Sequence, residues 1–266
     1  MRLQHSPIKS AAMELGLPVE TPVKSRAPEF VAQLRALEAD ALIVAAYGQI
    51  LSTAVLESAT RGGINLHGSI LPKYRGAAPI QRAVLNGDSE TGVTLMQMDR
   101  GMDTGDIIEI RRTQIDPDES YGELQNRLSI IAADQIHGWI DRIVGGNYPR
   151  TPQPEGATHA AKIEKAEAEL SFDRPSEAEY NRFRAFTPSP GAYFDIEGKR
   201  FRVARMATAE GQSGEPGTIV SVQPELVVAF QEGALAILEW QPEGKKRMSG
   251  RDYANGARLR PGMRLT

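Results

Sequence analysis

Asn65 and His67 are residues whose side chains can carry out acid–base chemistry, and they stand two positions apart. They end an apolar segment, 62–67, that predicts a strand, and side chains alternate along a strand, so both should point to the same side. An Asn amide can donate a hydrogen bond to an oxygen that gains negative charge, and a His can move protons near neutral pH. A single His is also a common structural hydrogen-bonding residue, so type and spacing alone leave both interpretations of His67 open.

A second cluster holds three aspartates, Asp99, Asp103 and Asp106, in a glycine-flanked loop. If this loop lies next to the end of the predicted strand at 62–67, Asp103 can orient His67 and balance its charge. Asp and Gly also favour turns for purely conformational reasons, which is the structural alternative for this cluster. The two clusters together predict a site without defining its reaction.

The elements that must position these clusters follow an α/β pattern. A segment at 41–47 predicts a strand buried on both faces, because its residues form one continuous apolar run. Alternating strands and helices indicate a parallel-type sheet, which places its sites at the carboxyl ends of strands. The expected helices are 6–14, 27–38, 77–86 and 120–144, and the expected extended segments are 17–21, 41–47, 62–67, 92–98 and 106–112.

The pattern changes after Gly146, where prolines and polar residues predict a linker. One further helix is expected over residues 176–186. Beyond Gly191 the sequence predicts short strands separated by glycine turns, which is typical of a small β-barrel or sandwich. These strands are expected at 192–196, 201–206, 217–222, 226–230 and 234–240.

Composition narrows the function classes. The chain has 266 residues, enough for two domains, and contains no Cys, which excludes disulfides, thiolate catalysis and cysteine-held metals. The spacing of its four His matches no metal motif, which disfavours a metal hydrolase. The longest apolar run, 41–47, is far shorter than the roughly 20 residues that span a bilayer, and no secretory signal opens the chain. We therefore expect a cytoplasmic globular protein without a membrane partner.

The net charge of −3 conceals an uneven distribution. Residues 181–266 carry more Lys and Arg than Asp and Glu, whereas residues 1–180 carry the reverse. A basic end is typical of proteins that bind a polyanion, although an ordinary solvated surface gives the same pattern.

Whole motifs carry more information than single residues. The run that starts at Asn65 follows the pattern Asn-x-His-Gly-Ser-x-Leu-Pro-x-x-Arg-Gly-Ala-Ala-Pro, and the later loop has Met-Asp-Thr-Gly-Asp around Asp103. Together these motifs resemble the folate-dependent formyltransferases. The resemblance implies that the family's catalytic Asn, His and Asp fall on Asn65, His67 and Asp103. The family's folate-contacting segment falls on Ser69, Ile70, Leu71 and Pro72.

Two C-terminal motifs resemble the branch of this family that acts on methionyl-tRNA. Residues 184–192 have Arg-Ala-Phe-x-Pro-x-Pro-Gly-Ala, and residues 241–248 have Gln-Pro-Glu-Gly-Lys-Lys-Arg-Met. The resemblance implies an α/β architecture with a Rossmann-like formyltransferase domain over 1–146 and a linker over 147–163. It also implies a C-terminal OB-type β-barrel domain that binds tRNA over 164–266.

The resemblance implies a defined reaction. The co-substrate 10-formyltetrahydrofolate gives its formyl group to the α-amino group of methionyl-initiator tRNA, for translation initiation, and no metal is required. Asn65 would donate a hydrogen bond to the developing oxyanion, with help from His67, which would also transfer protons. Asp103 would hold His67 in orientation and relay the proton through water.

Eight basic residues are candidate contacts for tRNA phosphates. Most of them lie in the basic end of the chain, and one lies in the interdomain stretch. A solvated surface charge is the alternative for each residue. The candidates are Lys162, Lys199, Arg200, Arg202, Arg205, Lys245, Lys246 and Arg247.

The resemblance departs from the family pattern at the front of the chain. Family members begin with a strand, a helix and a second strand, about forty residues before this sequence starts. We therefore expect an N-terminally truncated first domain, in which the strand at 41–47 has an open edge. Lower stability and self-association through that edge should follow, whereas the complete form should be a monomer.

Two other functions stay open. One is a formyltransferase that acts on a small amine, such as a nucleotide sugar or a ribonucleotide, which the basic C-terminal motif argues against. The other is a tRNA-binding protein whose catalytic domain is impaired by the missing front segment, and which would bind tRNA without transferring a formyl group.

Overall fold

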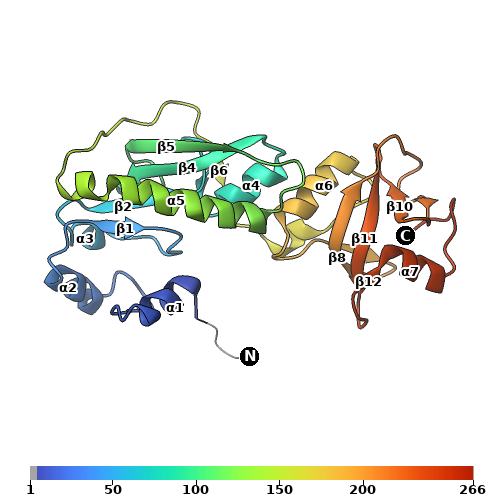
Figure 1. Cartoon of the computed structure of the whole chain (residues 1–266), viewed down its shortest axis with the longest axis horizontal. Coiled ribbons are helices and arrows are strands. Elements are labelled where there is room, and N and C mark those ends of the chain that lie inside the picture. The colour runs from blue at the N-terminus through green and yellow to red at the C-terminus, as the bar shows by residue number, and fades with distance from the viewer. Residues whose placement is uncertain (1–4, 266) are drawn as a thin grey trace.

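The computed structural model describes residues 5–265, so the parts of the two predicted domains at residues 1–4 and 266 lie outside the described residues. The molecule is elongated, with a four-stranded sheet towards one end and a six-stranded sheet at the other (Figure 1). Helices α4 (Pro79–Leu85) and α6 (Ser176–Ala185) lie between the sheets and confirm two predicted helices. Within the described part of the chain, every helix is too short or too polar to cross a membrane.

The four-stranded sheet is mixed. Its order is β1-β2-β4-β5, and only the β1–β2 pair is parallel, so the prediction of a parallel-type sheet is wrong for β4, which runs antiparallel to both of its neighbours. The reason is that a short loop joins β4 to β5, and a connection of this kind links antiparallel neighbours. The strands are β1 (Leu42–Val44), β2 (Gly63–His67), β4 (Glu90–Gln97) and β5 (Ile107–Gln114).

Helix α5 (Tyr121–Val144) lies across one face of this sheet (Figure 1). It starts at a capping box, in which the side chains of Ser120 and Glu123 each accept a hydrogen bond from the other residue's main-chain N–H. Ile143 of the helix packs against Ile64 of β2, and both are fully buried. Because side chains alternate along a strand, the two candidate residues of β2 point to the opposite face.

The chain before β2 forms three short helices. Helices α1 (Pro7–Glu14) and α2 (Pro28–Ala36) confirm two predictions, and α3 (Thr53–Leu56) adds to them. Helix α1 begins directly after Ser6, its N-cap residue, whose Oγ accepts a hydrogen bond from the main-chain N–H of Lys9. The extended segment expected at 17–21 forms no strand.

Strand β1 is shorter and more exposed than its sequence predicts. The apolar run 41–47 favours a strand buried on both faces, yet only three of its residues are extended, and Ile43 keeps 40% of its surface exposed. Within residues 5–265, β1 lies at the edge of the sheet with β2 as its only strand neighbour, so one side has no strand to cover it. The left-handed backbone of Ala46, with a φ of 46°, interrupts the extended run.

The proline-rich segment 147–163 lies beside the loops of the first sheet. Within it, β6 (His159–Ala160) pairs in parallel with β3 (Arg75–Gly76), which follows β2 along the chain. Thr151 forms a further bridge with Ile107 at the start of β5. The segment therefore contacts the chain directly after β2 and directly after the β4–β5 loop.

The six-stranded sheet is antiparallel, with the order β7-β8-β11-β10-β9 and with β12 paired to β11. All five predicted strands are confirmed, and β12 and helix α7 add to them. Register shifts in the β9–β10 and β8–β11 pairs mark bulges, which bend a sheet. The elements are β7 (Tyr193–Ile196), β8 (Lys199–Thr208), β9 (Ile219–Ser221), β10 (Leu226–Ala229), β11 (Ala234–Pro242), β12 (Met248–Ser249) and α7 (Gly250–Gly256).

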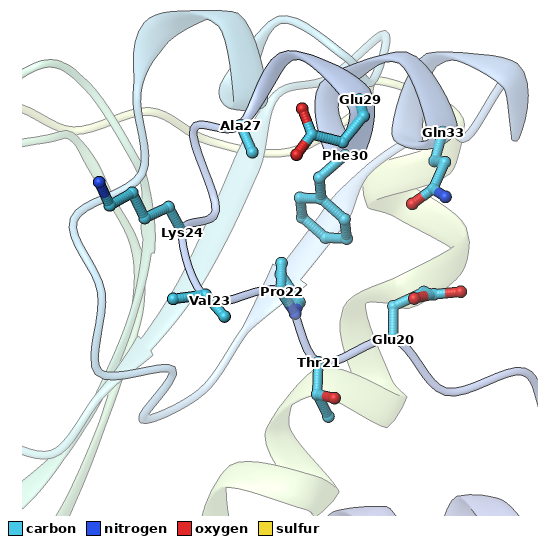
Figure 2. Close-up of a pocket in the computed structure, with 9 residues that line it drawn as sticks. All are labelled: Glu20, Thr21, Pro22, Val23, Lys24, Ala27, Glu29, Phe30 and Gln33. Atoms are coloured by element: carbon cyan, nitrogen blue, oxygen red, sulfur yellow. The ribbon is translucent and has the colours of Figure 1, made fainter.

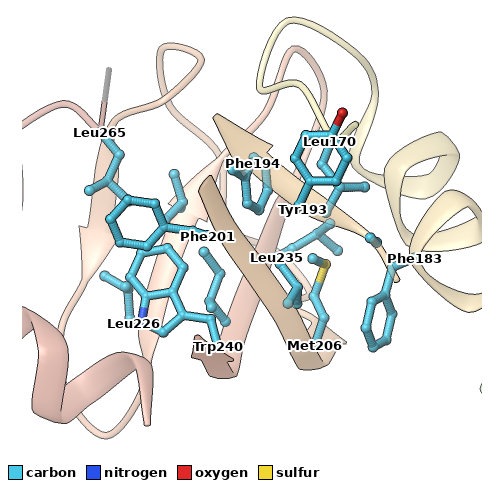
Figure 3. Close-up of a cluster of buried hydrophobic side chains, with 14 of the residues drawn as sticks. Leu170, Phe183, Tyr193, Phe194, Phe201, Met206, Leu226, Leu235, Trp240 and Leu265 are labelled. Carbon is cyan, nitrogen blue, oxygen red and sulfur yellow. The ribbon is translucent and has the colours of Figure 1, made fainter. Parts of the chain in front are cut away.

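Aromatic and aliphatic side chains form the core beside this sheet (Figure 3). The rings of Phe201 and Trp240 have centroids 4.7 Å apart, and the ring of Tyr253 from α7 lies edge-on to both. Aromatic contacts of this geometry contribute about 0.5–1.5 kcal/mol each beyond the burial of area. They hold α7 against the sheet.

The two sheets are joined through packed helices and charged groups. Ala185 of α6 is buried in one cluster with Ala83 of α4. Arg82 of α4 donates hydrogen bonds of 2.5 and 3.0 Å to the carboxylate of Glu167, which lies in the 3-10 helix η1 (Lys165–Ala168). The contact between the two halves is therefore partly apolar and partly ionic.

Candidate active site

Asn65 and His67 lie on β2, on the face of the sheet away from α5. Asn65 is 9% exposed and His67 is 6% exposed. A buried polar group without a hydrogen-bonding partner costs about 1–3 kcal/mol, so both side chains need partners on this face. Both contact the same residue, which comes from the β4–β5 loop.

Asp103 brings the three predicted catalytic residues together. Its Oδ1 accepts a hydrogen bond from Asn65 Nδ2 at 3.5 Å, and its Oδ2 lies 3.6 Å from His67 Nδ1. Oδ2 also accepts a hydrogen bond of 2.9 Å from Gly76 N, on β3. The carboxylate is 15% exposed, so its charge acts in a largely desolvated place.

The two ring nitrogens of His67 have different partners. Nε2 lies 2.9 Å from the carbonyl oxygen of Tyr74. A carbonyl only accepts, so this contact places the proton of the neutral ring on Nε2. Nδ1 is then free to accept a proton, and it faces Asp103. The hydrogen bond to the Tyr74 carbonyl is shorter than the contact with Asp103, so it is the one that fixes the orientation of the ring.

Tyr74 is itself held in an unusual conformation. Its backbone is left-handed, with a φ of 62°, and its N–H donates to Thr158 Oγ1 at 2.9 Å. Its phenol donates to Asp88 and accepts from Asn86, each at 2.9 Å. Burial is the main cause that raises the pKa of the Tyr74 phenol, so the phenol stays neutral at physiological pH. No residue-type signal points to Tyr74, because its main-chain oxygen makes the contact.

The β4–β5 loop gives Asp103 a left-handed backbone, with a φ of 54°. This conformation costs a non-glycine residue about 1–2 kcal/mol, so the surroundings must hold it. Asp99 Oδ1 accepts a hydrogen bond of 2.7 Å from Thr104 Oγ1, which is turn chemistry. Gly105 lies so close to Gln97 that an added Cβ would be 1.8 Å from the Gln97 carbonyl oxygen.

The predicted folate-contacting segment is built around two buried side chains. Ser69 Oγ donates to Lys73 O at 2.6 Å, and Ser69 O accepts from Thr94 Oγ1 at 2.6 Å. Thr94 Oγ1 also accepts from Leu71 N at 3.1 Å, and Leu71 is buried. Thr94 of β4 therefore fixes the segment, although its residue type gives no signal of this in the sequence. The side chains that stay partly exposed are Ile70 and Pro72.

Elsewhere, the described residues offer weaker candidates for a binding site. A cavity of about 390 Å³ lies between the loop at 20–24 and helix α2, where Phe30 sits beside Pro22 (Figure 2). None of its lining residues belongs to the group around Asp103. Among residues 5–265, no group of three or more His, Asp or Glu is arranged to hold a metal ion.

Most of the basic candidates gather at one end of β8. Lys199, Arg200 and Arg202 lie exposed at its start. The register that pairs Gln241 of β11 with Arg202 places the exposed turn with the basic residues 245–247 beside them. A groove of about 230 Å³ is lined there by the two arginines and by residues 241–244.

Two basic candidates stand apart from this group. Arg205 lies further along β8, with its Nη1 3.7 Å from the carboxylate of Glu239. Lys162 is exposed in the proline-rich segment, where its carbonyl accepts a hydrogen bond from Arg82 at 3.2 Å. These two residues therefore do not share the groove at the start of β8.

Two known families match the chain. The family described as "Formyl transferase" matches residues 2–136, and the family described as "Formyl transferase, C-terminal domain" matches residues 162–258. The first match includes Asn65, His67 and Asp103, and the second includes the six-stranded sheet.

Curated relatives match along the whole chain. The methionyl-tRNA formyltransferase of Symbiobacterium thermophilum is 44% identical over 270 residues, which cover 100% of this chain and 83% of the relative. The methionyl-tRNA formyltransferase of Geobacter metallireducens is 42% identical over 266 residues, which cover 99% of this chain and 85% of the relative.

Solved structures share the fold at low sequence identity. HypX from Aquifex aeolicus, in complex with tetrahydrofolic acid, gives a TM-score of 0.65 at 16% identity, over 86% of this chain and 41% of HypX. The N-formyltransferase from Helicobacter canadensis gives 0.64 at 18% identity, over 86% of this chain and 81% of that protein. Both family models match this chain, and its relatives at 42–44% identity are methionyl-tRNA formyltransferases. The chain therefore belongs to the formyltransferase family, in its methionyl-tRNA formyltransferase branch.

Proposed function

We propose that this chain transfers a formyl group from 10-formyltetrahydrofolate to the α-amino group of methionyl-initiator tRNA, in the cytoplasm, for translation initiation. The observation that carries the proposal is the convergence of Asn65 and His67 on Asp103. Its support is membership of a family whose curated relatives bear this activity in their names at 42–44% identity.

His67 is the proton-transfer group of this proposal. The methionyl amine forms a bond to the formyl carbon, the bond from that carbon to the folate nitrogen breaks, and a proton passes from the amine to the folate nitrogen. His67 Nδ1 accepts the proton of the amine, because the carbonyl of Tyr74 keeps the ring proton on Nε2. The protonated ring then gives the proton to the leaving nitrogen. Such acid–base groups contribute about 10²–10⁴-fold in rate.

Asp103 and Asn65 stabilise the charges that develop. An opposite charge about 4 Å away contributes about 4 kcal/mol at an effective dielectric of 20, against about 1 kcal/mol in water. The largely buried Asp103 carboxylate, 3.6 Å from His67 Nδ1, therefore stabilises the positive charge that develops on the ring while the proton is transferred. Asn65 Nδ2 has a second N–H without a partner among residues 5–265, and this group donates to the formyl oxygen as that oxygen gains negative charge.

The co-substrate site is proposed at residues 69–72. The buried side chains of Ser69 and Leu71 serve the segment's own shape through Thr94. Most main-chain groups of this segment already have partners, so the Ile70 N–H, the Leu71 carbonyl oxygen and the partly exposed side chains of Ile70 and Pro72 are the contacts proposed for the folate. This fits a pocket that recognises its ligand by shape and main-chain hydrogen bonds.

We propose that residues 1–146 form the catalytic domain, that 147–163 form the linker, and that 164–266 form an OB-type domain that binds tRNA. The bulged antiparallel sheet supports the OB-type assignment, because such bulges allow a sheet to curl. The groove at the start of β8 supports the tRNA assignment, because two arginines line it and residues 245–247 add charge beside it.

The edge of β1 is a proposed contact between copies of the chain. Ile43 is exposed there, and an unpaired strand edge is a template for another strand. Sedimentation velocity at increasing protein concentration tests this, because association through β1 predicts a larger species at high concentration. A single species at every concentration contradicts it.

The proposed function is tested by single-turnover formylation of methionyl-tRNA with 10-formyltetrahydrofolate. The unmutated chain is compared with His67→Ala and with His137→Ala, a matched change at an exposed His on α5. We expect product from the unmutated chain and from His137→Ala, and a rate at least about 10²-fold lower for His67→Ala with an unchanged circular dichroism spectrum.

Three results contradict the proposal. Near-normal turnover by His67→Ala removes the assigned base. Formylation of a nucleotide amino sugar in place of methionyl-tRNA indicates a small-amine formyltransferase. A folded chain that binds tRNA but forms no product indicates a tRNA-binding protein.

A further inference from the structure

Gln153, in the proline-rich segment, contacts the main chain of the loop that carries Asp103. Its Nε2 donates to Asp103 O and to Gly105 O, each at 2.8 Å. Its Oε1 accepts from Arg75 Nε at 3.0 Å and from Arg75 Nη2 at 2.6 Å. A glutamine amide has two N–H donors and one oxygen with two lone pairs, so all of its hydrogen-bonding positions are used.

This network allows one orientation of the amide. A flipped amide would turn its NH₂ group towards the guanidinium of Arg75, which has only donors, and its oxygen towards two carbonyl oxygens. Arg75 belongs to β3, which is held by its pairing with β6. The Gln153 side chain is therefore a fixed bridge between β3 and the Asp103 loop.

Burial sets Gln153 apart from its neighbours. Pro152, Pro154 and Glu155 are exposed, whereas Gln153 is partly buried. The prolines on both sides restrict the backbone of this stretch to extended conformations. Holding a side chain in place costs less conformational entropy in a stiff segment than in a flexible loop, so the prolines favour the fixed position of Gln153.

We propose that Gln153 is a positioning residue for formyl transfer, holding Asp103 in the left-handed conformation from which its carboxylate reaches both Asn65 and His67. The inference rests on the proposed function. Gly76 N holds the carboxylate end of Asp103, and Gln153 is the partner of its main-chain oxygen among residues 5–265. Without that partner the backbone relaxes to a common φ, and the carboxylate swings away from His67.

Two variants separate the contacts of Gln153. Gln153→Ala removes all of them, whereas Gln153→Glu keeps an acceptor for Arg75 and sets an oxygen against the carbonyls of Asp103 and Gly105. Both variants should lower kcat by about tenfold to a hundredfold and change the KM of either substrate by less than about twofold, because misplacing a catalytic group by about 1 Å slows the step without weakening binding. The control is Glu155→Ala, a change at an exposed residue of the same segment, which should behave as the unmutated chain.

A second readout needs no turnover. Gly76 N donates to Asp103 Oδ2 at 2.9 Å, so the NMR signal of the Gly76 amide proton reports the position of the carboxylate. Both Gln153 variants should move this signal in the same direction as Asp103→Ala does, and Glu155→Ala should leave it in place.

An unchanged kcat in Gln153→Ala overturns the proposal, whatever the Gly76 signal does. A loss of activity that comes with a changed KM and a large fall in melting temperature also overturns it, because the side chain is then merely structural. If the unmutated chain fails to formylate methionyl-tRNA, the proposed function is wrong, and the Gly76 signal alone decides whether Gln153 holds Asp103.

Discussion

Two residues in left-handed backbone conformations face His67 from different sides. Asp103 and Tyr74 have φ values of 54° and 62°. The first presents its carboxylate to Nδ1 and the second its carbonyl to Nε2. Backbone strain of this kind costs about 1–3 kcal/mol per residue and persists only where the surroundings hold it. The geometry around His67 therefore depends on the residues that hold Asp103 and Tyr74 in these conformations.

Gly105→Ala tests this dependence at the residue scale. The new Cβ would lie 1.8 Å from Gln97 O, so the loop or the end of β4 must shift. We expect the free energy of unfolding to fall by about 1–3 kcal/mol and turnover to fall with it, because Asp103 moves. Urea denaturation and the formylation assay measure both.

Gly138→Ala, on α5, is the matched control for that change. Its Cβ has room, because the nearest atom outside the neighbouring backbone of its own helix, Arg111 Nη2, lies 3.8 Å away. Ala is favoured over Gly within a helix by about 0.5–1 kcal/mol. Equal stability of Gly105→Ala and Gly138→Ala would show that the close approach to Gln97 is unimportant.

Only part of this site can be predicted from the sequence. The alternation of side chains along β2 places Asn65 and His67 on one face, and the loop motif supplies Asp103. Tyr74 contributes a main-chain oxygen, which any residue type possesses, so its identity gives no signal. Gln153 is a single polar residue in a proline-rich stretch, and the sequence cannot distinguish it from a solvated one.

At the scale of elements, the short pair of β3 and β6 connects the site to the proline-rich segment. Thr158, just before β6, accepts a hydrogen bond of 2.9 Å from Tyr74 N. The Arg75 N–H donates to the Thr158 carbonyl at 2.8 Å. The segment thus supports both partners of His67: Tyr74 through Thr158, and Asp103 through Gln153.

Thr158→Val tests the contribution of this pair. Val has the shape of Thr but no hydroxyl, so Tyr74 N loses its acceptor, and stability should fall by about 1 kcal/mol. Turnover should fall as well, because the Tyr74 carbonyl that orients His67 becomes less fixed. Thr151→Val, at an exposed position whose bridge uses the main chain, should change neither property. A wild-type rate in Thr158→Val would contradict this account.

The fold is predicted best where local signals agree with tertiary structure. Helices α1 and α5 start at the serines, Ser6 and Ser120, that cap them. Strand β1 is shorter than its apolar run, because burial depends on neighbours that a local pattern cannot report. A local pattern also cannot report the direction of a strand, so the antiparallel run of β4 differs from the prediction. Strand β12 has two residues, too few for any periodicity.

At the scale of the whole molecule, the ion pair of Arg82 and Glu167 joins the two halves. The hydrogen bonds from Arg82 are the main cause that lowers the pKa of Glu167 below its ordinary value of 4.5. The folded state thus favours the charged carboxylate more than the unfolded state does. This stabilisation is complete above the ordinary pKa and is lost as pH falls through the lowered value.

Glu167→Gln should therefore destabilise the chain in a pH-dependent way. At pH 7 we expect a loss of about 1–2 kcal/mol relative to the unmutated chain, because a charge-assisted hydrogen bond is weakened. The difference should start to shrink as the pH falls below about 4.5 and should vanish below the lowered pKa of the folded state, where Glu167 is protonated in the unmutated chain as well. Urea denaturation of both proteins at several pH values measures it, and a difference that does not change with pH would count against the linkage.

The central claim is that Asn65, His67 and Asp103 act as one unit, and single-turnover formylation of methionyl-tRNA tests it most directly. The account predicts that Asn65→Ala, His67→Ala and Asp103→Ala each slow the transfer by at least about 10²-fold. It also predicts that the double variant His67→Ala/Asp103→Ala is little slower than the slower single variant, because residues that act together are not additive. A single variant at nearly the unmutated rate, or a double variant whose effects multiply, would contradict it.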